Sequence, residues 1–161
     1  MLVLIIQIGP DRFALDARVV REVVPAVALR ALPHAPPEVA GLATWRGEVT
    51  PVIDLVRLLR GQPCPARMSS RLVVVDYPTP SGPRPLGLLA EQVTDVERID
   101  ERAAHDPGVT VPDAPYLGRV LRSPTIAHGA LIQLVEVTAL LPESLRALLY
   151  AAVAEAGREP A

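Results

Sequence analysis

Residues 40–55, AGLATWRGEVTPVIDL, contain two apolar runs that are separated by the dipeptide Arg46-Gly47. A glycine at such a position is typical of a tight hairpin turn, because the favoured hairpin turns need positive φ angles. Beyond the turn, Val49, Pro51 and Ile53 occupy every second position, which is the period of a strand with one buried face. The stretch therefore predicts a β-hairpin. Arg46, on its turn, is a candidate for recognition of a partner and not for catalysis.

The sequence after this hairpin predicts one short helix. Leu55, Leu58 and Leu59 follow the helical spacing. Asp54 is a suitable N-cap, and Gly61 is suited to end the helix.

Further strand-like and helix-like segments fill the rest of the chain. Apolar runs predict strands at residues 2–8, 12–15, 27–32, 71–77, 117–121 and 130–137, and residues 86–100 continue the second β-rich half of the chain. Residues 17–24 predict a short helix that Asp16 caps and Pro25 ends. A second, amphipathic helix is expected after Pro142. Residues 100–115 have no consistent period and predict a long surface loop.

Length and composition predict one mainly β domain. The chain has 161 residues, of which 50% are hydrophobic but only 3% aromatic, so Val, Leu, Ile and Ala must build the core. A proline-rich joint at 62–66 separates a first β-rich half, about 9–61, from a second, about 71–141. The single domain is expected over 1–156, with a frayed tail at 157–161.

Charge and hydropathy narrow the class of partner. The net charge of −2 argues against a broad nucleic-acid surface, although a small β-barrel nucleic-acid-binding module stays open as an alternative. The single cysteine, Cys64, forms no internal disulfide, which fits a reducing compartment. No apolar run reaches the ~18–20 residues that span a bilayer, so we expect a cytoplasmic protein without direct membrane insertion.

The sequence offers no catalytic constellation. His34, His105 and His128 are far apart and lack the short spacing of a metal site. Nucleophile-elbow, phosphate-loop and dinucleotide motifs are missing. We therefore predict no enzyme activity, no catalytic residue, no metal and no cofactor. Asp100 and Glu101, which lie near Glu97, are expected to face solvent.

The segment Pro78–Pro85 has two interpretations. It suits a rigid connection between two strands, and it also resembles a proline-rich ligand of SH3 or WW domains. The connection is favoured because strand-like runs lie on both sides of it.

The order of these features resembles the CheW family, the coupling proteins of bacterial chemosensory arrays. The resemblance is carried by the Arg-Gly turn with its following Pro-Val-Ile-Asp-Leu, by RFALDARVVREVVP at 12–25 and by ALIQLVEVTALL at 130–141. It covers nearly the whole chain. It implies two small five-stranded SH3-like barrels packed on a common core, with short helices and a C-terminal helix. The family usually has Asn-x-Arg-Gly where this chain has Thr44-Trp45-Arg46-Gly47.

The resemblance also implies a function. It implies an adaptor that couples the cytoplasmic tips of chemoreceptors to the SH3-like regulatory domain of a CheA-like histidine kinase, at membrane-associated receptor arrays. A variant of this hypothesis is a Wsp-type surface-sensing pathway that controls cyclic-di-GMP synthesis. Thr44-Trp45, the proline-rich loops and the segment Pro115–Val120 favour that variant.

The family's binding residues transfer to individual positions of this chain. Arg46 falls at the arginine of the receptor-binding groove and Glu22 at a matching acid. Val20 and Val23, on the helix face beside Glu22, are either the apolar part of this groove or ordinary core. The implied receptor-binding residues are Val20, Glu22, Val23, Arg46 and Gly47. The implied kinase-binding residues are Pro37, Glu38, Val39 and Gly41.

Overall fold

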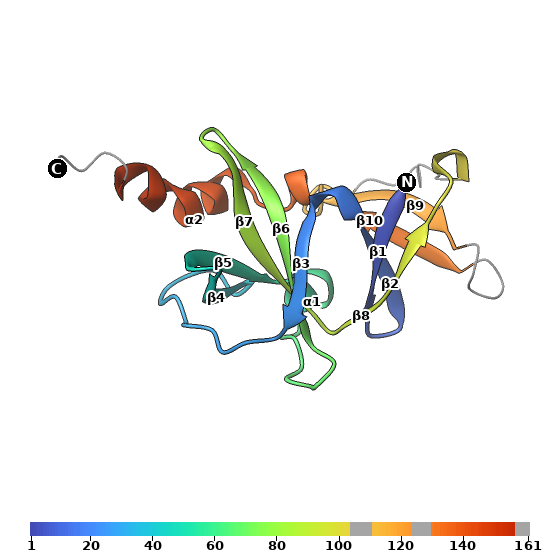
Figure 1. The fold of residues 1–161 in the computed structure, drawn as a ribbon, viewed down its shortest axis with the longest axis horizontal. Coiled ribbons are helices and arrows are strands. Elements are labelled where there is room, and N and C mark those ends of the chain that lie inside the picture. The colour runs from blue at the N-terminus through green and yellow to red at the C-terminus, as the bar shows by residue number, and fades with distance from the viewer. Residues whose placement is uncertain (104–110, 124–129, 157–161) are drawn as a thin grey trace.

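Two five-stranded sheets, each coiled into a small SH3-like barrel, form the body of the protein (Figure 1). The computed structural model describes residues 1–103, 111–123 and 130–156. Barrel 1 has the strand order β8-β1-β2-β10-β9, and barrel 2 has the order β3-β6-β7-β5-β4. The mainly β fold with two packed barrels confirms the prediction.

The strand bounds show that each barrel takes strands from distant parts of the chain. Barrel 1 contains β1 (Leu2–Ile8), β2 (Asp11–Asp16), β8 (Gln92–Arg98), β9 (Leu117–Arg122) and β10 (Leu131–Val135). Barrel 2 contains β3 (Val20–Pro25), β4 (Val39–Trp45), β5 (Glu48–Asp54), β6 (Arg71–Thr79) and β7 (Gly82–Ala90). The helices are α1 (Leu55–Arg60) and α2 (Glu143–Ala156), with short 3-10 turns η1 (Ala17–Val19), η2 (Glu101–Ala103) and η4 (Val137–Ala139).

Three apolar clusters explain the long apolar runs of the sequence. Alternate residues of a strand point to opposite faces. Ile5 therefore lies inside barrel 1 and Ile6 in the core between the barrels. In the same way Val74 lies inside barrel 2 and Val75 in the shared core. Both faces of β1 and β6 are thus buried, and their sequences are continuous and apolar instead of alternating.

The predicted hairpin and the helix after it are confirmed. β4 and β5 pair up to Trp45 and Glu48, and the turn residues Arg46 and Gly47 have φ angles of 49° and 75°. Asp54 accepts a hydrogen bond of 3.0 Å from the backbone N–H of Arg57 at the start of α1. Local turn and capping chemistry therefore determines this part of the fold.

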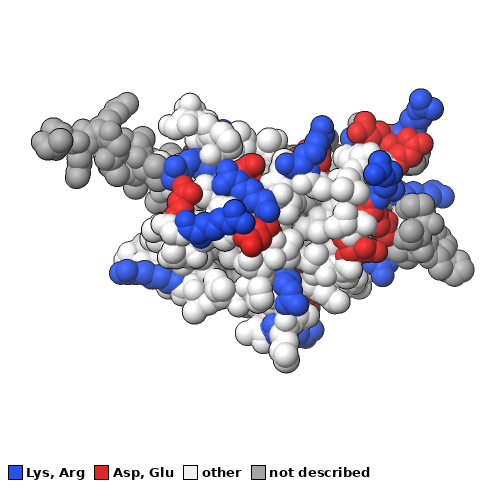
Figure 2. Space-filling model, viewed as in Figure 1, with Lys and Arg blue, Asp and Glu red and all other residues white. Residues whose placement is uncertain are grey.

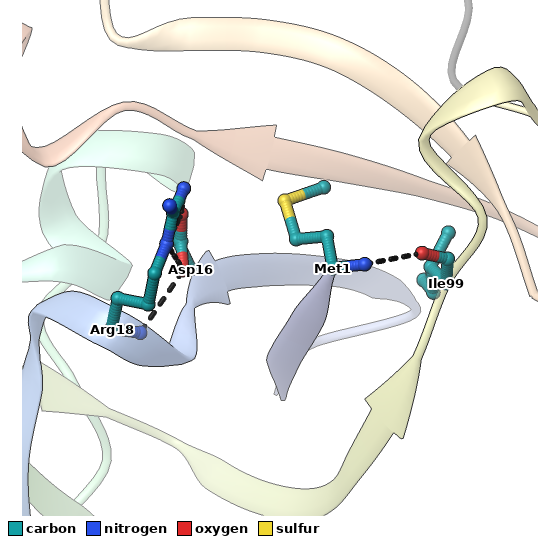
Figure 3. Close-up of polar contacts among 4 residues, drawn as sticks. All are labelled: Met1, Asp16, Arg18 and Ile99. Atoms are coloured by element: carbon teal, nitrogen blue, oxygen red, sulfur yellow. Dashed lines mark hydrogen bonds and ion pairs between the residues drawn. The ribbon is translucent and has the colours of Figure 1, made fainter.

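The helix predicted over 17–24 is wrong. Asp16 does cap a helical turn, since it accepts a hydrogen bond of 3.0 Å from the N–H of Arg18 (Figure 3), but that turn is η1 and ends at Val19. The next six residues form β3, which pairs with β6. β-branched side chains such as Val20 and Val23 favour the extended state where a neighbouring strand is available.

The strand predicted over 27–32 is also wrong. Only Arg30 pairs, in a single bridge with Leu42 that has two backbone hydrogen bonds of 2.9 and 2.8 Å. Pro25 and Pro33 border the segment, and a proline has no N–H with which to continue a ladder. The segment is therefore an irregular connection beside β4.

The remaining predictions have mixed outcomes. Pro78–Pro85 is part of the β6–β7 hairpin, as favoured, with Thr79 paired to Gly82. α2 follows Pro142 as predicted. Within the predicted loop at 100–115, residues 101–103 form η2, and 104–110 lie outside the described residues, as does the tail at 157–161.

The ends of the described chain are held to the barrels. The amino group of Met1 donates a hydrogen bond of 2.8 Å to the carbonyl of Ile99, just after β8 (Figure 3). α2 lies along barrel 2 (Figure 1), with Leu145 and Leu149 in the core between the barrels. No helix in the described ranges is both long and apolar enough to cross a membrane.

Candidate functional site

The structure brings Arg46 and Glu22 together, although they come from different parts of the chain. Arg46 lies on the β4–β5 turn and Glu22 on β3, and the Nε of Arg46 is 3.5 Å from Oε2 of Glu22. The side chain of Arg46 is 69% exposed and that of Glu22 is 37% exposed. An ion pair that is this open to water contributes only about 0–1 kcal/mol to stability. It can therefore be exchanged for a partner's charge at little cost.

Trp45 contacts both members of this ion pair. Its indole Nε1 donates a hydrogen bond of 2.6 Å to Oε2 of Glu22. The guanidinium carbon of Arg46 lies 4.9 Å from the ring centre, and that of Arg21 lies 5.6 Å from it. The ring also packs against the apolar interior of barrel 2. Trp45 is not among the site residues expected from the sequence, although its departure from the family pattern is a signal that could have identified it.

Two more ion pairs lie on the same barrel. Arg21 pairs with Asp76, and Arg84 pairs with Glu48 at 2.8 Å. The ion-pair cluster is defined here as Arg21, Glu22, Trp45, Arg46, Glu48, Asp76 and Arg84. On the face shown in Figure 2, basic and acidic groups alternate over the barrel that β3–β7 form. The three arginines and three carboxylates balance, so a partner gains by exchange of contacts and not by net attraction.

Val20 and Val23 lie on the other face of β3. Val20 is opposite Val75 and Glu22 is opposite Val74, with an irregularity of the register between them. Neighbouring residues of β6 point to opposite faces, so Val20 and Glu22 also point to opposite faces. Val20 packs against the core between the barrels, and Val23 is 37% exposed. The predicted placement of the two valines on a helix face beside Glu22 is therefore wrong.

The apolar surface beside the cluster comes from other residues. A hollow lies between the β4–β5 hairpin and α2, and Arg84 of the ion-pair cluster is one of its lining residues. Val49, which is 64% exposed, and Leu148 are among its lining residues. The hairpin therefore has charged and apolar contact surfaces next to each other.

The predicted kinase-binding residues are contiguous but differ in exposure. Pro37 is exposed and Glu38 is half-buried, whereas Val39 belongs to the core between the barrels. Gly41 is buried with φ of 142°, and a Cβ there would lie 2.4 Å from the carbonyl oxygen of Arg30. Pro37 and Glu38 are thus the side chains available to a partner, while Val39 and Gly41 fix the position of the backbone at the start of β4.

The cysteine and acidic side chains in the described ranges differ in their surroundings. No three His, Cys, Asp or Glu side chains within those ranges lie close enough to hold a metal ion. Burial, together with the charge of Asp54, raises the pKa of the Cys64 thiol to about 11, which leaves it protonated at neutral pH. Asp100 and Glu101 are exposed as expected, but Glu97 is buried and accepts a hydrogen bond from Ser123 at 3.1 Å.

Comparisons with known proteins match nearly the whole chain. The family model of the CheW-like domain matches residues 2–145. The chain is 25% identical over 142 residues to the chemotaxis protein CheW of Rhizobium meliloti, which covers 87% of this chain and 86% of that protein. The crystal structure of the scaffolding protein TtCheW from Thermoanaerobacter tengcongensis superposes with a TM-score of 0.72 at 24% identity, over 85% of this chain and 89% of that one. That structural likeness concerns the fold.

Proposed function

The chain belongs to the CheW-like domain family, and we propose that it couples the cytoplasmic tips of chemoreceptors to the regulatory domain of a CheA-like histidine kinase. A chemosensory adaptor of this kind is not an enzyme and needs no cofactor. It needs only a difference in contact free energy between two signalling states of its partners. Binding to receptor tips would place it in membrane-associated arrays.

The observation that carries this proposal is the exposed pair of Arg46 and Glu22 on barrel 2. An arginine presents a planar set of donors that suits a carboxylate, and Arg46 lies on a tight turn with Gly47 exposed beside it. A receptor carboxylate would replace Glu22 as the partner of Arg46. Val20 and Val23, on the other face of β3, remain proposed as apolar support for this contact.

We assign the kinase contact to the segment Pro37–Gly41. It enters β4, whose other end carries Trp45 and the Arg46 turn, so both proposed contacts lie on barrel 2. Pro37 and Glu38 would touch the kinase domain, and Val39 and Gly41 would fix their backbone. A receptor and a kinase domain would thus be held at opposite ends of one strand.

A Wsp-type surface-sensing pathway is a second candidate for the system that the adaptor serves. Thr44-Trp45 in place of the family's usual residues favours it, because Trp45 alters the chemistry around the receptor-contacting arginine. The two candidates are distinguished by measuring whether the protein binds the receptor of a chemotaxis pathway or that of a Wsp-type pathway more tightly.

Titration of the purified protein against the receptor tip and the kinase encoded nearest to its gene tests the proposal. Arg46→Ala is expected to weaken receptor binding by about tenfold, a change of ~1.4 kcal/mol, while kinase binding and the thermal midpoint are kept. Arg122→Ala, an exposed arginine on β9 of barrel 1, is the matched control and should bind both partners normally. Equal receptor binding by the two variants would contradict the assignment of Arg46, and no binding by the wild type would contradict the adaptor function.

A further inference from the structure

The oxygen of Glu22 that faces Arg46 is shared with Trp45. Both the indole Nε1 and the guanidinium Nε approach Oε2, the indole at 2.6 Å and the guanidinium at 3.5 Å. A hydrogen bond to a charged acceptor at the shorter distance is the stronger of the two contacts. Glu22 is therefore held mainly by Trp45, and Arg46 is the partner that leaves more easily.

This arrangement matters when Arg46 is taken by another carboxylate. An acid that loses its only partner leaves a poorly satisfied charge, which opposes the exchange. Here Glu22 keeps the N–H of Trp45 after Arg46 has turned away. We propose that Trp45 is a positioning and specificity residue that holds Glu22 in place and so releases Arg46 for a carboxylate of the partner. This inference rests on the proposed function.

The surroundings of Arg46 also define the chemistry of the group it receives. Glu22, Glu48 and Asp76 all lie within the ion-pair cluster, and Arg21 and Arg84 are already paired with two of them. Of the three arginines in the cluster, Arg46 therefore has the longest ion-pair distance, and its side chain is also the most exposed. A singly charged carboxylate replaces Glu22 charge for charge, whereas a phosphate dianion adds repulsion from the nearby acids. The partner group is therefore an Asp or Glu side chain.

A double-mutant cycle on receptor-tip binding tests this role. Trp45→Phe keeps an aromatic ring but removes the N–H, and Glu22→Gln removes the charge that competes for Arg46. Trp45→Phe is expected to weaken binding about five- to tenfold in the wild-type background, as for the loss of one charge-assisted hydrogen bond. In the Glu22→Gln background the same change should alter binding by less than about twofold, because the competing charge is already gone.

A spectroscopic readout follows the hydrogen bond itself. Trp45 is the only tryptophan of the chain, so its indole N–H gives one resonance in a proton–nitrogen spectrum. That resonance should lie downfield and exchange slowly with water. It should stay so in Arg46→Ala and at saturation with the receptor tip, and it should move upfield in Glu22→Ala.

Each outcome decides the matter. The inference is supported if Trp45→Phe weakens receptor binding in the wild-type background but not in the Glu22→Gln background, and if the indole hydrogen bond is kept in the complex. An equal loss in both backgrounds would mean that the ring acts only by packing, and no loss in either would mean that it has no role; both overturn the inference alone. No receptor binding by the wild type overturns the proposed function, and the inference with it.

Discussion

Tyr77 of β6 and Tyr150 of α2 stack with ring centroids 5.6 Å apart and ring planes within 3° of parallel. The hydroxyl of Tyr150 also donates a hydrogen bond of 3.2 Å to the carbonyl of Pro85 on β7. Together these contacts attach α2 to barrel 2, in addition to the burial of Leu145 and Leu149. The attachment determines one wall of the hollow beside the ion-pair cluster.

Removal of the Tyr150 ring should therefore detach α2 and destabilise the protein. Tyr150→Ala is expected to lower the free energy of unfolding by about 3 kcal/mol, and Tyr150→Phe, which keeps the stack, by only about 1 kcal/mol. Urea denaturation measures both values. Leu148→Ala, on an exposed position of the same helix, is the control and should change stability by about 0.5 kcal/mol. Equal effects of the two tyrosine variants would mean that the stack contributes nothing.

The tyrosines also predict how stability depends on alkaline pH. Burial raises the pKa of all three, Tyr77, Tyr116 and Tyr150, above the ordinary value near 10.0. The folded state then binds these protons more firmly than the unfolded chain does. Stability is accordingly unaffected by them below about pH 10 and falls as the pH rises further. Thermal midpoints measured from pH 8 to 11.5 should decline above pH 10, and tyrosinate absorbance near pH 10 should be weaker in the folded protein than in urea.

Cys64 should react slowly with alkylating reagents while the protein is folded. The rise of its thiol pKa from 9.0 to about 11 lowers the thiolate fraction at pH 8 by about a hundredfold. Labelling with iodoacetamide, followed by mass spectrometry, should be slower by about that factor in buffer than in urea. The folded protein's rate should also keep increasing beyond pH 10. Equal rates in buffer and urea at pH 8 would show that the thiol is not protected.

Two glycines of the same hairpin should differ in their tolerance of a side chain. Gly41→Ala is expected to lower the free energy of unfolding by about 3 kcal/mol, because the new Cβ meets the Arg30 carbonyl at a strained φ. Gly47→Ala has open space around it and should cost only about 1 kcal/mol, from its positive φ. Denaturant titrations compare them directly, and similar values would remove the steric argument.

The parts of the fold that local chemistry determines were predictable from the sequence. The Arg46-Gly47 turn and the capping of α1 by Asp54 depend on neighbouring residues, and both predictions are confirmed. The helix predicted over residues 17–24 is wrong because the pattern of a short valine-rich segment fits a helix and a strand equally well. Pairing with β6, which no local signal reveals, decides between them.

The candidate site was predictable only in part, for the same reason. The family resemblance implied Arg46 and Glu22 as site residues, and the structure places their side chains within an ion-pair distance. The role of Trp45 depends on a hydrogen bond to a residue on another strand, so no spacing in the sequence indicates it. The register irregularity that turns Val20 away from Glu22 is likewise a property of the strand pair and not of either segment alone.

The interleaving of the two barrels has a consequence for how the chain acquires its fold. In barrel 1, β10 lies between β2 and β9, so Phe13 near one end of the chain pairs with Gln133 near the other. The chain leaves barrel 1 after β2, completes barrel 2 and only then returns with β8, β9 and β10. During synthesis the apolar faces of the first hairpin therefore stay uncovered until β8, β9 and β10 have been made. Pairings between strands so far apart in the sequence slow folding, and they leave the apolar faces of β1 and β2 exposed to aggregation while barrel 1 is incomplete.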